Sequence, residues 1–285
     1  MKQSWTLLTA IYRLYEHSQF SMAGAVAFSF VVSLFPFCIL LGALSGIFGG
    51  RELAETVVHH LFQILPHSVA AGLAPQVEEI MTRSRVDLMT IGGAVTLFFA
   101  TSAIETLRAA LNFAYRVREK RPYVVCLMIS MVHVFVTAIV LLLLSWTLIV
   151  APTLAAQLES KVLDDFMQSP WVRNGLLYAV IAAIIGGQLF AAHLYLAAGK
   201  RTIAQVWPGV VLTLVLWSAA GWAYSIYLGY SNYTRFYAGL SQLMIALIFF
   251  QLTAVIIILG AELNRGLIEF KKMRESRKAA AEGGT

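Results

Sequence analysis

Six long apolar segments run through the chain and are separated by shorter polar stretches. Asp, Glu, Lys and Arg are absent from residues 18–50, 88–104, 122–158, 174–199, 202–234 and 236–261. A helix needs about 20 apolar residues to cross the hydrocarbon core of a membrane, with about 17 as the lower limit. The second segment is the shortest, and we expect its helix to continue through Glu105 and Arg108 to Tyr115. The pattern therefore predicts six spans, at about residues 20–48, 88–115, 123–150, 174–198, 206–229 and 238–265.

Composition supports the same fold class. Of 285 residues, 59% are hydrophobic and only 13% are charged, and the mean hydropathy is +0.74. A soluble protein of this size needs a charged surface to stay dispersed, and this chain has too few charges to cover one. We expect an all-α, polytopic membrane bundle with short amphipathic helices in its outer loop.

The segments between the spans complete the predicted organisation. Residues 1–17 resemble a cytoplasmic interfacial helix, because Trp5, Leu8, Tyr12 and Tyr15 share one helical face. The membrane domain covers residues 18–266, with an outer loop at 49–87 in which two amphipathic helices are expected. Residues 267–285 form a basic cytoplasmic tail.

The distribution of Lys and Arg predicts the orientation. Alternating loops place fifteen of the 21 basic residues on one side and six on the other. The richer side is cytoplasmic by the positive-inside rule, which puts both termini in the cytoplasm of a bacterial-type inner membrane. The net charge of +6 then needs no nucleic-acid partner, and the tail is expected to contact anionic lipid headgroups.

Polar side chains inside two predicted spans are the candidate functional residues. Steps of three and four residues align a stripe in the second span, and a similar stripe lies in the sixth span. The candidates for a cavity lining are Glu105, Arg108, Asn112, Gln251, Glu262 and Asn264. An ionisable side chain at membrane depth costs about 2.5–3.5 kcal/mol to insert, which favours a functional role. A packing or topology role is an equally weighted alternative.

Other features favour structural roles. Pro36 lies inside the first span and is expected to bend its helix, and Gly42, Gly46 and Gly50 form a four-residue ridge suited to close packing. His133 and His193 lie in spans without a second metal ligand nearby, which favours hydrogen bonds between helices. We expect no metal and no cofactor.

Three segments resemble a known family. They are AGAVAFSFVVSLFPFCILLG with its SLFP element at Ser33–Pro36, ATSAIETLRAALNFAY with Leu111–Asn112, and LGAELNRG at Leu259–Gly266. In this order they are similar to the YihY/virulence factor BrkB family of bacterial inner-membrane proteins. The resemblance implies six spans. Members have been linked to serum resistance and to export of lipid-A precursors, and some have carried a ribonuclease BN label. The start of the last span departs from the family, because Tyr237–Leu240 reads YAGL and IFFQL lacks a tryptophan.

Two classes of function follow from these features. The first hypothesis is a transporter or flippase-like protein for an amphipathic, anionic envelope lipid or small molecule. Arg108 would attract the headgroup, Glu105 would hold Arg108, and Glu262 and Asn264 would contact the polar part or a coupling proton. The second hypothesis is a non-catalytic scaffold that binds a second copy of itself or an envelope protein. A membrane-embedded hydrolase or nuclease is less favoured, because the cytoplasmic carboxylates are scattered along the sequence.

Overall fold

The computed structural model describes residues 19–48, 91–157, 170–230 and 241–282. Every regular element in these ranges is a helix, so the all-α prediction is confirmed for this part of the chain. The elements are α2 Gln19–Phe48, α5 Ile91–Ala114, α6 Tyr123–Gln157, α8 Pro170–Ala191, the π-helix η2 Ala192–Leu196, α9 Ile203–Tyr230 and α11 Ser241–Glu282. The predicted interfacial helix at 1–17 and the outer loop at 49–87 lie outside the described residues.

Four described helices are long and apolar enough to cross a membrane. Their apolar stretches are Tyr123–Leu143, Ala179–Leu196, Ile203–Tyr227 and Leu243–Ala280. Only 22 to 44% of the most apolar window of each is buried inside the protein, so most of this apolar surface needs a lipid environment. In α2 the apolar stretch is shorter and covers Gln19–Leu34, and in α5 charged residues interrupt the apolar sequence. The count of six spans stays a prediction.

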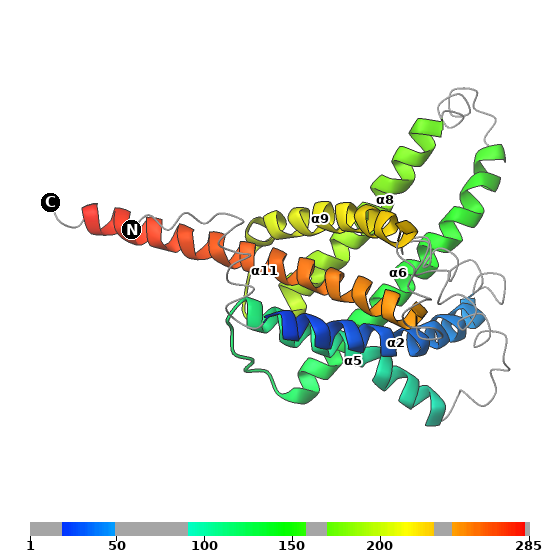
Figure 1. Cartoon of the computed structure of the whole chain (residues 1–285), viewed down its shortest axis with the longest axis horizontal. Helices are drawn as coiled ribbons and strands as arrows, with labels where there is room; N and C mark the ends of the chain where they lie inside the picture. The colour runs from blue at the N-terminus through cyan, green and yellow to red at the C-terminus, as the bar shows by residue number, and fades with distance from the viewer. Residues whose placement is uncertain (1–18, 49–90, 158–169, 231–240, 283–285) are drawn as a thin grey trace.

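The centre of the bundle is a row of packed helices. α2 packs on α5 and α11, α11 packs on α9, and α9 packs on α8. Figure 1 shows α2, α5, α9 and α11 side by side, whereas α6 and α8 diverge from the bundle as a pair. The main core gathers buried side chains from α2, α5, α8, η2, α9 and α11, including Val26, Leu111, Leu196, Val206 and Ile258. This core lies where α5 and η2 end and α6 and α9 begin, which we call the polar end of the bundle because of the side chains described below.

Two glycines set the crossing of α9 over α11. A Cβ atom on Gly209 would collide with the carbonyl oxygen of Gly260, and one on Gly260 would lie 2.7 Å from the carbonyl oxygen of Gly209. Small residues allow this approach, as is common between helices in lipid. The ridge predicted at Gly42, Gly46 and Gly50 stays a prediction, because Gly50 lies outside the described residues.

α2 remains helical on both sides of Pro36. The missing N–H of the proline costs the helix one backbone hydrogen bond without ending it. Pro36 lies one turn from Ser33, whose hydroxyl donates to the carbonyl oxygen of Phe99 in α5 at 2.6 Å. This bond attaches the proline-containing part of α2 to its neighbour.

Candidate functional site

Glu105 and Arg108 pair within α5, as their three-residue spacing predicts. The Arg108 Nη2 atom lies 2.6 Å from Glu105 Oε2, and both side chains are largely buried. Ser130 in α6 donates its hydroxyl hydrogen to Glu105 Oε1. The carboxylate therefore joins α5 to α6 as well as balancing the arginine.

A third charged residue, Glu119, completes this group from outside the helix. α5 ends at Ala114, and Arg116 adopts a left-handed conformation with φ of 53°, which turns the chain back over the helix end. Glu119 Oε2 then accepts hydrogen bonds from Arg108 Nη1 and Asn112 Nδ2, each at 3.1 Å. Arg121 Nη2 lies 2.7 Å from the same oxygen.

Glu119 binds two arginines and Asn112, and these contacts were not predicted from the sequence. Arg108 is paired with both Glu105 and Glu119, and its role in attracting an anionic headgroup stays a prediction. A signal for Glu119 exists in the sequence: it is the single acidic residue in the basic stretch from Arg116 to Arg121.

The hydrogen bonds from Arg121 hold the pKa of the Glu119 carboxyl well below its usual range. A carboxyl whose pKa is lowered by folding stabilises the fold above its usual pKa, and this contribution is lost as the pH falls. We therefore expect the melting temperature of the detergent-solubilised protein to change little between pH 7 and about pH 5, and to fall as the pH drops further, below the usual pKa of Glu. Glu119→Gln should show a lower melting temperature at pH 7 and a smaller fall. Glu275→Gln, in an exposed part of α11, is the control. Equal pH dependence in wild type and Glu119→Gln would contradict this assignment.

Two arginines and an asparagine hold the end of η2. A π-helix has a wide turn and is often found at functional sites. Arg121 donates to the carbonyl oxygens of Tyr195 and Leu196 at 3.0 and 2.8 Å. Arg201 donates to that of Ala198 at 2.7 Å, and Asn112 Oδ1 accepts from the Ala198 N–H at 2.6 Å. The α5–α6 connection and the start of α9 are thereby fixed to η2.

A chain of hydrogen bonds crosses the polar end from α9 to η2. The Gly209 N–H donates to Asn264 Oδ1 at 2.7 Å, so the other end of the Asn264 amide donates to the Tyr115 hydroxyl at 3.2 Å. The Tyr115 hydroxyl shares a further hydrogen bond with His193 Nδ1, which is 2.8 Å away. The guanidinium of Arg201 lies 3.6 Å above the Tyr115 ring.

Glu262 forms a separate buried group. Its side chain is 1% exposed, and its Oε1 atom accepts a hydrogen bond of 2.5 Å from Gln19 Nε2 in α2. Arg265 Nε lies 3.2 Å from Glu262 Oε2, and Arg265 Nη1 lies 2.8 Å from Glu269 Oε1. The donor role of Gln19 was not expected, because nothing local in the sequence brings Gln19 near Glu262.

The candidates from the sequence thus fall into different places. Glu105, Arg108 and Asn112 form one group, and Asn264 joins α5 through Tyr115. The described hydrogen bonds and ion pairs do not connect Glu262 directly with Glu105. Gln251 is exposed on α11 and does not line a shared polar surface with Glu262, which corrects that prediction. Helical periodicity shows which residues share one side of a helix. It does not show whether a neighbouring helix packs on that side along its whole length.

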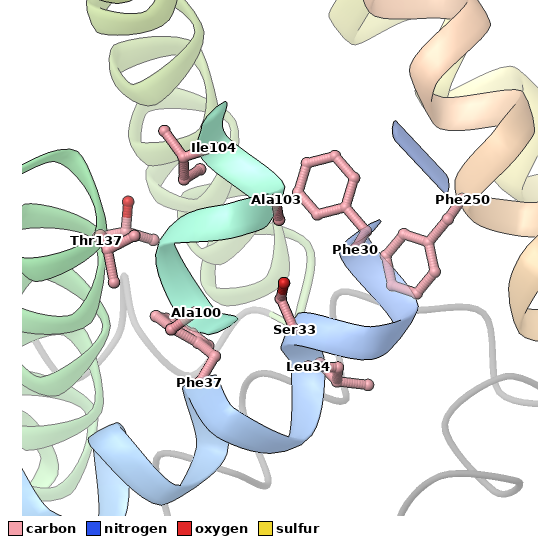
Figure 2. Close-up of a pocket in the computed structure, with 10 residues that line it drawn as sticks. Phe30, Ser33, Leu34, Phe37, Ala100, Ala103, Ile104, Thr137 and Phe250 are labelled. Atoms are coloured by element: carbon pink, nitrogen blue, oxygen red, sulfur yellow. The ribbon is translucent and has the colours of Figure 1, made fainter. Parts of the chain in front are cut away.

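An apolar cavity of about 200 Å³ lies between α2, α5, α6 and α11 (Figure 2). The residues that line it are Phe30, Ser33, Leu34, Phe37, Ala100, Ala103, Ile104, Val134, Thr137 and Phe250. The rings of Phe30 in α2 and Phe250 in α11 stack at 5.8 Å between centroids and both line the cavity. Ile104 precedes Glu105, so the cavity adjoins the charged group. Sequence reasoning missed it, because a cavity depends on side-chain packing between helices.

The comparison with known families agrees with this architecture. The family model described as virulence factor BrkB matches residues 10–283. The chain belongs to the virulence factor BrkB family. The resemblance stated from the three sequence segments is thereby confirmed, as is the membrane class of the protein.

Curated relatives of this BrkB-family protein are distant. The putative ribonuclease-like protein YfkH of Bacillus subtilis is 24% identical over 269 residues, covering 90% of this chain and 93% of the relative. A UPF0761 membrane protein of Xanthomonas oryzae is 24% identical over 274 residues, covering 93% of this chain and 61% of the relative. The chain therefore spans about three fifths of the Xanthomonas relative. No solved structure matches.

The names of these relatives differ on catalysis, and neither decides it for this chain. One is named ribonuclease-like and the other a membrane protein. Among the residues that the structure describes, no group of three His, Cys, Asp or Glu side chains is placed to hold a metal ion. The carboxylates of the polar end, Glu105, Glu119 and Glu262, each accept hydrogen bonds from arginine.

Proposed function

We propose that this BrkB-family protein is an inner-membrane transporter or flippase-like protein for an amphipathic envelope lipid or small molecule. Six spans would cross the membrane, with both termini and the polar end of the bundle in the cytoplasm. The observation that carries the proposal is the apolar cavity beside charged groups within a membrane bundle. Such a cavity suits a molecule with an apolar part and a polar part.

The size of the cavity limits what it encloses. A cavity of about 150 Å³ lined by apolar side chains binds benzene. The cavity here, at about 200 Å³, accommodates a ring or a short length of one hydrocarbon chain. It does not enclose a whole two-chain lipid, so most of a large lipid would remain outside the bundle while one chain enters.

The polar end would act as a fixed base for movement elsewhere. Its arginines and carboxylates join α5 to α6, η2 to the α5–α6 connection, and α2 to α11. Because these groups are paired and largely buried, opening the bundle at this end would break several charged hydrogen bonds. Movement that admits a ligand is therefore easier in the other half, where Pro36 lies in α2 and where α6 and α8 diverge.

Filling the cavity tests the proposal. Ala103 lines the cavity and is 3% exposed, so Ala103→Phe places a ring in the space that a ligand would use. We expect wild-type protein purified in native nanodiscs to carry a specific amphipathic molecule, and Ala103→Phe to lose most of it. Mass spectrometry of the extracted small molecules measures this loss. Ala219→Phe, on the exposed surface of α9, is the control and should retain the molecule.

The alternatives give distinct results. Equal retention of the same molecule by wild type and Ala103→Phe would overturn the proposed use of the cavity. Bulk lipid alone in all three samples would do the same. In either case the scaffold hypothesis would lead, and partners would be sought by crosslinking the intact protein in membranes.

A further inference from the structure

A polar stripe on α6 connects the charged group to the cavity. At about 100° per residue, Ser130, His133 and Thr137 fall within about 60° on one side of the helix. Ser130, at one end of the stripe, donates to Glu105. Thr137, at the other end, lines the apolar cavity, and Figure 2 shows its side chain there.

The hydroxyl of Thr137 meets the side chain of Gln188 from α8. Thr137 Oγ1 lies 2.8 Å from the carbonyl oxygen of His133 and 3.2 Å from Gln188 Oε1. A hydroxyl has one hydrogen to donate, so it cannot satisfy both oxygens. Since the bond to His133 is shorter, the Gln188 amide is better placed with its nitrogen toward Thr137. With its nitrogen toward Thr137, the Gln188 amide has its oxygen and one N–H hydrogen available for another partner.

The charges around this pair are already balanced. Arg108 and Arg121 are the cations of the neighbouring charged group, and Glu105 and Glu119 are bound to them. Ser130 connects α6 to the carboxylate of Glu105. The negative charge of this carboxylate would repel an anionic headgroup bound nearby. An ionised headgroup at this depth would lack a counter-ion among these residues. A hydroxyl group would instead find both donors and acceptors in Thr137 and Gln188.

We propose that Thr137 and Gln188 bind the uncharged, hydroxyl-bearing head of a single-chain amphipath whose hydrocarbon chain occupies the cavity. This inference rests on the proposed function and names the class of molecule that the cavity takes. Burying a polar group of the protein or of the ligand without a hydrogen bond is unfavourable, so the hydroxyl and the Gln188 amide satisfy each other.

Four probes with the same chain length and different head groups test which head group the site prefers. The purified full-length protein is incubated in detergent with dodecanol, dodecanoate, dodecylamine or dodecane, and bound probe is measured by native mass spectrometry. We expect dodecanol to bind about tenfold more tightly than the other three, as one or two hydrogen bonds imply. Dodecanoate or dodecane binding as tightly as dodecanol would overturn the proposal, and so would preferred binding of dodecylamine.

Variants then separate this site from the cavity itself. The double variant Thr137→Val, Gln188→Leu keeps similar volumes but removes the hydrogen bonds, so it should bind dodecanol and dodecane equally. Ser218→Ala, at an exposed position of α9, is the control and should keep the preference for dodecanol. If the double variant also keeps that preference, the site is wrong.

Ala103→Phe distinguishes the two proposals. Loss of all four probes from Ala103→Phe, with no preference among them in wild type, overturns only the hydroxyl site. Retention of the probes by Ala103→Phe overturns the use of the cavity and hence the proposed function.

Discussion

Gly209→Ala is expected to destabilise the protein by about 3 kcal/mol, because the added methyl group has no space between α9 and α11. Its Cβ atom would collide with the carbonyl oxygen of Gly260 and with the side chain of Asn264. The Gly260 oxygen is part of the backbone and cannot rotate away. Asn264 accepts the Gly209 N–H bond, so a shift of this side chain also weakens its bond to Tyr115.

Gly221→Ala provides a matched control in the same helix. A Cβ atom on Gly221 meets nothing within 4 Å, and alanine favours a helix over glycine by up to about 1 kcal/mol. Gly221→Ala should therefore melt at or slightly above the wild-type temperature, whereas Gly209→Ala should melt well below it. Thermal unfolding in detergent, followed by the loss of monodisperse protein on size-exclusion chromatography, measures both. Melting of Gly209→Ala at the wild-type temperature would show that the helices separate at little cost.

The helices follow from the sequence because the signal for them is local and long. Gaps in the charge pattern predicted a helix from residue 123, and α6 begins at Tyr123. The ends are less well predicted, because a charged residue can end a membrane span without ending a helix. Arg173 lies inside α8, which begins at Pro170, a favoured residue in the first turn. Past the predicted span end at 265, α11 continues to Glu282, through residues that favour helices and include neither glycine nor proline after Gly266.

The contacts of the polar end were predictable only within one helix. The Glu105–Arg108 pair follows from three-residue spacing, which is a property of the helix itself. Glu119 reaches Arg108 only because the chain turns back at Arg116, and Gln19 reaches Glu262 only because α2 packs on α11. Such contacts depend on how helices are arranged, and a single sequence carries no direct record of this.

Hydrophobic periodicity did not predict which side chains lie in the interior of the bundle. Ala103 and Thr137 read as ordinary positions in apolar spans, yet both line the cavity. Gln251 lies at nearly the same angle on α11 as Glu262, yet one is exposed and the other is buried. In a membrane bundle nearly every position is apolar, so the sequence pattern does not distinguish a lipid-facing side from an interior one.

Glu262→Ala is expected to destabilise the protein by about 3 kcal/mol, because it leaves Arg265 buried without its buried carboxylate partner. Arg265 is 5% exposed, and its other carboxylate partner, Glu269, lies nearer the surface with 43% of its side chain exposed. The Gln19 amide would also lose its acceptor, which weakens the attachment of α2 to α11. Glu275→Ala removes a carboxylate from the exposed part of the same helix and should change the stability by less than about 0.5 kcal/mol.

A double variant shows whether the loss of stability in Glu262→Ala comes from the buried charge of Arg265. Replacing both partners of a buried ion pair by apolar residues is often close to neutral, whereas removing one partner is costly. The double variant Glu262→Ala, Arg265→Met should therefore melt at a higher temperature than Glu262→Ala alone, although Glu269 loses its ion pair with Arg265. Thermal unfolding of the four proteins in the same detergent decides the matter. If the double variant melts below the single variant, Arg265 stabilises the bundle through contacts that do not depend on Glu262, and the loss in Glu262→Ala does not come from the buried charge of Arg265.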